Sequence, residues 1–226
     1  MNVLDTKNPL YFTARPNTKK VLYKLRPVFN ETFGHLRSPS RIKEFRGFAP
    51  EGNVQTEDLC DLLDKLKFLR GFIKQEYYEG GVENYYANFL KIVKSFGVAN
   101  CFEYAVIAKT ILRLNKIKNV DIFSVQVKDA KGNIKDFDHA VVALGVSKSK
   151  NNKKTKQVFK PSKNTLIVDL WWPFGTICKL KNVRKKYRIM GLKDSDEIMF
   201  KPVKIPEPNT KSLNNVTEQL PQLKFN

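Results

Sequence analysis

The sequence has few of the residues that build disulfide frameworks and metal sites. Its 226 residues include three cysteines and two histidines. Cys60, Cys101 and Cys178 show no CxxC spacing, so neither a disulfide framework nor a zinc site is predicted. We expect no metal, and the cysteine usage fits a reducing compartment best.

Long apolar runs are also missing. No stretch approaches the ~18 apolar residues of a membrane-spanning helix, and residues 1–20 contain no apolar core of a secretory signal peptide. We therefore expect a cytosolic protein, or one that a dedicated secretion machine exports into a host cytosol. The hydrophobic content of 42% is nevertheless that of a globular chain and excludes a disordered one.

Acidic residues are scarce relative to basic ones. The chain has 22 Asp and Glu and 41 Lys and Arg, which gives a net charge of +19. Such an excess attracts acidic protein partners, anionic membrane surfaces or nucleic acid. A solvated lysine-rich surface explains the same charge. Only the charge points to nucleic acid as a partner. Nucleic-acid binding is therefore not favoured, although the charge does not exclude it.

Helical patterns precede strand patterns along the chain. A leucine stripe at i, i+3, i+4 and i+7 spacing predicts a helix from Thr56, and Gly80–Gly81 separates it from a second helix that ends at Phe96. The next segment, which ends at Leu114, is apolar nearly all round and predicts a buried helix with Cys101 in its first turn.

From residue 120 the apolar period changes to two, which is typical of strands. A hairpin loop is expected at 129–133 and an exposed basic loop at 147–164. The strands are expected at Val120–Val127, Phe137–Leu144, Thr165–Trp172, and around Thr176–Val183 and Glu197–Val203. A buried helix followed by antiparallel strands indicates an α+β fold.

The expected organisation is one domain with two extensions. Residues 56–204 form the α+β domain. Residues 1–55, which contain scattered prolines and basic residues, are predicted to be an irregular N-terminal extension or lid, and residues 205–226 a flexible C-terminal tail.

Three residues suited to nucleophilic catalysis follow one another on these elements. Cys101 lies at a helix start, where N–H groups and a partial positive charge favour a thiolate and can receive an oxyanion. His139, in the second strand, can take the thiol proton, and Asp169, in the third, can orient the imidazole. A single cysteine or histidine is more often an ordinary core residue than a catalytic one. Asp169 is harder to explain as a core residue, because burying an unpaired carboxylate is costly. Together they predict a catalytic triad.

The motifs around these residues resemble the transglutaminase-like superfamily. They are Gly97-x-x-Asn100-Cys101-x-Glu103-x-Ala105, Asp138-His139-Ala140-Val141-Val142 and Ile167-Val168-Asp169-Leu170-Trp171. They also resemble the papain-like Cys-His-Asp proteases and deamidating toxins that bacterial secretion systems deliver into host cells. The resemblance covers roughly residues 97–175. It implies a papain-like or transglutaminase-like core, in which a buried helix carrying the nucleophile packs on an antiparallel sheet.

The implied activity is acyl transfer from a protein amide through a thioester, in a bacterial effector that acts on a host protein. No metal or organic cofactor is implied. A thiol protease with the same triad and a non-catalytic basic interaction module are the alternatives.

Four further residues are candidates for the oxyanion and substrate sites. Papain-type proteases place a glutamine upstream of the cysteine to complete the oxyanion hole. Gln75 is the available glutamine, and Asn100 or the backbone alone is the alternative. The aromatic residues Trp171 and Trp172 are candidates for lining the acyl-acceptor path.

Overall fold

A computed structural model describes residues 16–33, 36, 56–145, 165–171, 176–188 and 192–220. These residues form helices and one antiparallel sheet, so the predicted α+β class is confirmed. The expected loop at 147–164 and Trp172 lie outside the described residues. None of the described helices is long and apolar enough to cross a membrane.

The sheet has five strands in the order β4-β3-β2-β1-β5, and every neighbouring pair is antiparallel. The strands are β1 (Val120–Lys128), β2 (Ile134–Leu144), β3 (Leu166–Asp169), β4 (Thr176–Lys179) and β5 (Glu197–Pro202). The predicted hairpin loop joins β1 to β2, and the Asp129 carboxylate accepts backbone N–H bonds from Lys131 and Asn133, both at 2.9 Å. This Asx-type turn sets the hairpin register.

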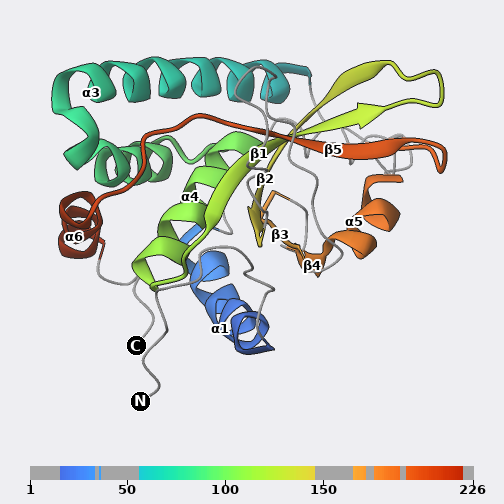
Figure 1. The fold of residues 1–226 in the computed structure, drawn as a ribbon. Helices are drawn as coiled ribbons and strands as arrows, with labels where there is room; N and C mark the ends of the chain where they lie inside the picture. Colours follow the sequence, from blue (N-terminus) through green and yellow to red (C-terminus); the bar gives the residue numbers. More distant parts are fainter. Residues whose placement is uncertain are drawn as a thin grey trace, which may run out of the picture.

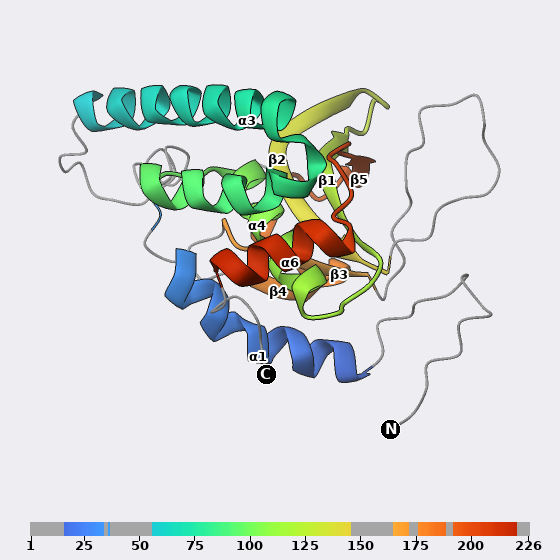
Figure 2. The same cartoon turned by 90° about the vertical axis from the view of Figure 1, so that its left-hand side faces the viewer.

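Helices cover both faces of the sheet unequally (Figures 1 and 2). The larger layer contains α1 (Pro16–Phe33), α3 (Thr56–Phe96), α4 (Cys101–Leu114) and α6 (Thr210–Gln219), and α5 (Leu180–Tyr187) lies on the opposite face. Strand residues alternate between the two layers. Val142 packs into the larger layer, whereas its neighbour Val141 packs with α5.

The central helix of the larger layer is α4, as the sequence predicted. Every residue from Glu103 to Leu112 is buried, and Asn100 is the N-cap. One buried residue is a cation, Lys109, whose ammonium lies 2.8 Å from the Glu207 carboxylate. A buried charge is tolerated when it is paired in this way.

The long helix α3 bends where the sequence predicted a break. Gly81 has φ 63° and ψ −175°, which is not helical and which side chains other than glycine rarely adopt. The part after Gly81 carries the buried residues Phe89, Leu90 and Val93, so it packs into the core.

Two segments expected to be irregular or flexible are helices of the core instead. In α1, within the supposed N-terminal extension, Leu22, Leu25 and Phe29 are buried with the larger layer. Pro27 lies inside this helix and disguises it in the sequence, because proline disfavours a helix interior. In the supposed C-terminal tail, Val216 of α6 is fully buried. Tertiary packing overrides local preference in both segments.

The strand expected around Thr176–Val183 is also shorter than predicted. It ends at Lys179, and α5 begins at Leu180. Val183 and Tyr187 are four residues apart, and both are buried on the face of α5 that packs on the sheet. The basic residues between them hide this helical period.

The inclusion of α1 in the core can be tested with Leu25→Ala. We expect the free energy of unfolding to fall by about 2–5 kcal/mol, because a fully buried leucine is lost. Urea denaturation measures the change. The control Asn30→Ala alters an exposed residue of the same helix and should change stability by no more than about 0.5 kcal/mol. Equal small effects from both variants would contradict the packing of α1.

Candidate functional site

A buried hydrogen bond joins two neighbouring strands at the centre of the candidate site. His139 Nε2 lies 2.7 Å from Asp169 Oδ2, and both side chains are at most 4% exposed. Backbone pairing between β2 and β3 extends from the pair of Leu144 and Leu166 to the pair of Val142 and Val168. His139 and Asp169 lie beyond the end of this pairing. Their side chains bridge the two strands where backbone pairing ends. The length is that of a charge-assisted hydrogen bond.

An irregularity in β2 comes directly before this histidine. The β1–β2 register places Val125 opposite His139 but Gln126 opposite Asp136, so two residues of β2 have no partner in the ladder. Such bulges bend a strand and re-aim the side chains beside them. The bulge therefore belongs to the local structure that sets the direction of the imidazole.

The thiol of Cys101 meets the same imidazole from the helical layer. Cys101 is the first residue of α4 and is partly exposed. Its side chain is within hydrogen-bonding contact of the His139 ring. Because Asp169 occupies Nε2, the nitrogen left for the thiol is Nδ1. The three residues predicted from the sequence are therefore brought together in one cluster.

The thiol lies at a helix start, where the first backbone amides make no intrahelical hydrogen bond. The first intrahelical bond of α4 runs from the Tyr104 N–H to the Asn100 carbonyl at 3.0 Å. The amides of residues 101–103 come before it, so they are not used by the helical ladder. The Glu103 amide is used by the Asn100 side chain in the capping box, so the amides of Cys101 and Phe102 are the ones that can receive an oxyanion that forms next to the sulfur.

A buried carboxylate fixes the start of this helix. Glu103 is fully buried, and its Oε2 accepts the Asn100 backbone N–H at 2.9 Å. Arg70 of α3 donates to both oxygens of the same carboxylate, at 2.9 and 3.3 Å. The sequence motif around Cys101 contains Glu103 but does not indicate a role for it. Its spacing of three from Asn100, typical of a capping box, is the signal that could have found it.

The electrostatic surroundings favour a protonated imidazole. Burial by itself lowers the pKa of His139, but the Asp169 charge, the hydrogen bond to Asp169 and the contact with Cys101 outweigh it. Together they raise the pKa of His139 to about 10. A thiol beside an imidazolium is the arrangement from which cysteine enzymes generate their thiolate.

Two aromatic rings enclose the imidazole. The Trp171 ring centroid lies 4.8 Å from that of His139, and the Tyr187 ring packs edge-on against it at 5.5 Å. Trp171 is only 2% exposed, so its contact is with the imidazole rather than with an open path. Burial raises the pKa of Tyr187, and the nearby Asp169 charge adds to this.

The Tyr187 hydroxyl and Asp169 Oδ1 are buried, and neither hydrogen-bonds to any described residue. Sequence reasoning missed Tyr187, because α5 was expected to be part of a strand. The i, i+4 pair with Val183 is the signal that could have placed Tyr187 on a buried helix face.

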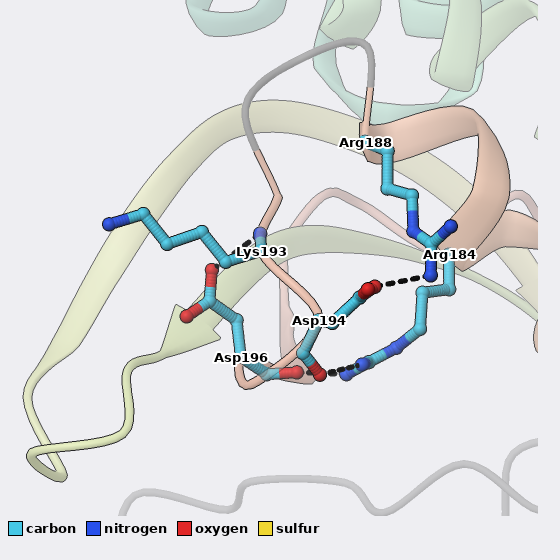
Figure 3. A network of polar contacts seen from close by, with 5 residues as sticks. All are labelled: Arg184, Arg188, Lys193, Asp194 and Asp196. Carbon is cyan, nitrogen blue, oxygen red and sulfur yellow. Dashed lines mark hydrogen bonds and ion pairs between the residues drawn. The ribbon is translucent and has the colours of Figure 1, made fainter.

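A polar network holds α5 in place (Figure 3). The Arg184 guanidinium donates to the backbone carbonyls of Asp194 and Asp196, and Arg188 pairs with the Asp194 carboxylate. The Asp196 carboxylate accepts the Lys193 backbone N–H at 2.8 Å. These contacts tie the helix to the segment before β5, and thereby hold the tyrosine at the end of α5 against the imidazole.

The remaining predicted residues are placed differently. Asn100 caps α4, but Gln75 is exposed on α3 and donates to Glu79 on the same helix at 2.8 Å. No described contact joins Gln75 to the cluster. Cys178 lies partly buried in β4. Within the described ranges, no three His, Cys, Asp or Glu side chains gather closely enough to hold a metal ion.

Comparison of the chain with protein-family models, with curated proteins and with solved structures finds no match.

The role of the Tyr187 ring can be separated from that of its hydroxyl. Tyr187→Phe keeps the ring against His139 and removes the unpartnered hydroxyl, so we expect stability to rise by about 1–3 kcal/mol. Tyr187→Ala leaves a cavity and should lower stability by about 3–5 kcal/mol. Iodoacetamide labelling of Cys101 should persist in the first variant and weaken in the second. Equal labelling rates in both would show that the ring does not support the imidazole.

The His139–Asp169 bond predicts a pH-dependent contribution to stability. The pKa of His139 rises from 6.5 to about 10 on folding, so its stabilising effect is complete below about pH 6.5 and is lost as pH approaches about 10. In a Cys101→Ala background, Asp169→Asn should lower the free energy of unfolding by about 3–5 kcal/mol at low pH. This difference should shrink as the pH rises through the pKa of His139, which lies below about 10 in this background because the contact with Cys101 is absent. Urea denaturation at several pH values measures it, and a constant difference would contradict the pairing.

Proposed function

We propose that this protein is a cysteine-nucleophile enzyme that transfers acyl groups from protein amides through a thioester, on a papain-like or transglutaminase-like core. One observation carries the proposal. A partly exposed thiol at a helix start contacts a buried imidazole whose other nitrogen is held at 2.7 Å by a buried carboxylate. In this proposal Cys101 is the nucleophile, His139 the acid and base, and Asp169 the group that orients His139.

The first half-reaction forms the thioester. The Cys101 thiolate attacks the carbonyl carbon of a glutamine side chain or a peptide bond, and the new oxyanion is received by amides at the start of α4. When the C–N bond breaks, protonated His139 gives its proton to the departing nitrogen. Ammonia leaves from a glutamine side chain, and an amine leaves from a peptide bond.

The second half-reaction releases the acyl group. Neutral His139 takes a proton from the acceptor, which attacks the thioester carbon, and the C–S bond breaks to restore the thiolate. Water as acceptor gives deamidation or proteolysis, and a lysine amine gives an isopeptide bond. The sequence motifs favour the transglutaminase and deamidase branch, and thiol proteolysis is the alternative with the same triad.

A purely structural role for the three residues explains less. Buried ion pairs contribute little net stability, because desolvation offsets their attraction. A packing role also gives no reason for a reactive side chain at a helix N-terminus to contact the paired imidazole from another layer. A basic interaction module on this scaffold is the non-catalytic alternative.

The proposed setting is that of a bacterial effector acting on a host protein, and it rests on the sequence motifs. The net charge of +19 supports an acidic protein partner or an anionic membrane surface.

The decisive test is the rate of Cys101 alkylation by iodoacetamide as a function of pH. We expect rapid labelling well below the pH of about 8.5 at which a free cysteine ionises. His139→Ala should abolish this low-pH reactivity, and Asp169→Asn should weaken it. Cys178→Ser serves as the control, because Cys178 is the other partly buried cysteine among the described residues.

Two outcomes separate the proposal from its alternatives. Low-pH labelling that depends on His139 supports the triad, and ammonia release from glutamine-containing proteins then distinguishes deamidation and crosslinking from peptide cleavage. Labelling that begins only near pH 8.5, whether or not His139 is present, would leave the interaction module as the better explanation.

A further inference from the structure

A groove of about 280 Å³ lies beside the start of the nucleophile helix. Its walls come from α3, from the first turn of α4 and from the chain that follows β5, which passes between these helices in Figure 1. The apolar lining residues are Ile73, Tyr85, Phe102, Ile205 and Pro206. Such a mixture of aliphatic and aromatic walls suits an apolar side chain.

The charged residues of the groove are predominantly basic. Glu103, the one acid among its described lining residues, is fully buried and is bound by the Arg70 guanidinium, so these two charges balance each other. Lys74, from α3, and Lys204, from the chain after β5, are exposed, and neither has an ion-pair partner among the described residues. The net charge of the groove is therefore positive, and it comes from these two lysines.

The groove is close enough to Cys101 to bind the same substrate. Phe102 and Glu103 line it, and Phe102 directly follows Cys101 in the chain. Consecutive Cα atoms are about 3.8 Å apart, and an extended peptide advances about 3.3–3.6 Å per residue. A substrate segment of a few residues is therefore long enough to extend from the groove to Cys101.

We infer that this groove is a substrate subsite, which binds an apolar side chain next to one or more carboxylates of the protein that carries the reacting amide. The inference rests on the proposed function, because it takes Cys101 as the reacting group. The apolar walls would hold the side chain, and Lys74 and Lys204 would hold the carboxylates. Charge pairing of this kind mainly selects partners and speeds their association.

Iodoacetyl-capped peptides test the inference without knowledge of the natural substrate. An acidic peptide, GFEE, and a basic peptide, GFKK, carry the same alkylating group and differ in charge. We expect the acidic peptide to label Cys101 about tenfold faster than the basic one at low salt, and the difference to shrink as salt is added. Lys74→Glu/Lys204→Glu should remove or reverse this preference.

The charge-matched control is Lys116→Glu/Lys118→Glu. These lysines are exposed beyond the C-terminal end of α4, which is about 20 Å from Cys101 along a helix of this length. The control should keep the preference for the acidic peptide. Equal loss in both double variants would mean that the net charge, not the groove, selects the peptide, and would overturn the inference.

Unmodified iodoacetamide separates the two proposals. If it labels Cys101 in the His139-dependent manner but the two peptides react equally, the groove inference fails and the proposed function stands. If iodoacetamide does not label Cys101 at low pH, the proposed function fails. Fluorescence anisotropy of acetyl-capped GFEE then tests the groove alone. If the peptide binds and Lys74→Glu/Lys204→Glu abolishes the binding, the groove is kept as a site for acidic peptides. If the peptide does not bind, the groove inference is overturned.

Discussion

The hydrogen bond between His139 and Asp169 is the interaction on which the candidate site depends. Both groups are buried, and an unpaired charge at either position would be costly. The bond bridges β2 and β3 beyond the part of the strands that is paired through the backbone. The bulge in β2 and the rings of Trp171 and Tyr187 then hold the imidazole in place.

The thiol contacts this imidazole from the helical layer, not from the sheet. Almost all of α4 is buried, so its first residue has little freedom to move. The Arg70–Glu103 pair ties that first turn to α3 and also contacts the backbone just before Cys101. The cysteine and the imidazole are therefore positioned by independent sets of contacts, one in the helical layer and one in the sheet. Arg70 and Glu103, which belong to the contacts in the helical layer, also line the groove beside Phe102.

Sequence reasoning succeeded where a short-range pattern and the tertiary environment agree. The apolar helix after Asn100, the break near Gly81 and the hairpin around residue 131 all appear in the structure. It failed for α1, α5 and α6. In α1 an internal proline conceals a buried stripe, and in α5 and α6 many polar residues surround only a few buried ones. Such segments become helices mainly because the core accepts their few apolar side chains.

The sequence by itself determined the chemical types at the site and their order: a cysteine at a helix start, then a histidine and an aspartate in successive strands. Local periodicity places such residues on elements, because helix and strand repeats extend over only a few residues. Only the tertiary structure decided which groups meet. Several features of the site depend on residues whose spacing in the chain follows no helix or strand repeat. They are the 2.7 Å bond, the contact of the Tyr187 ring, the anchoring of Glu103 by Arg70 and the separation of Gln75 from the cluster. Contacts between distant segments follow from how the layers pack, and that packing is a property of the whole core.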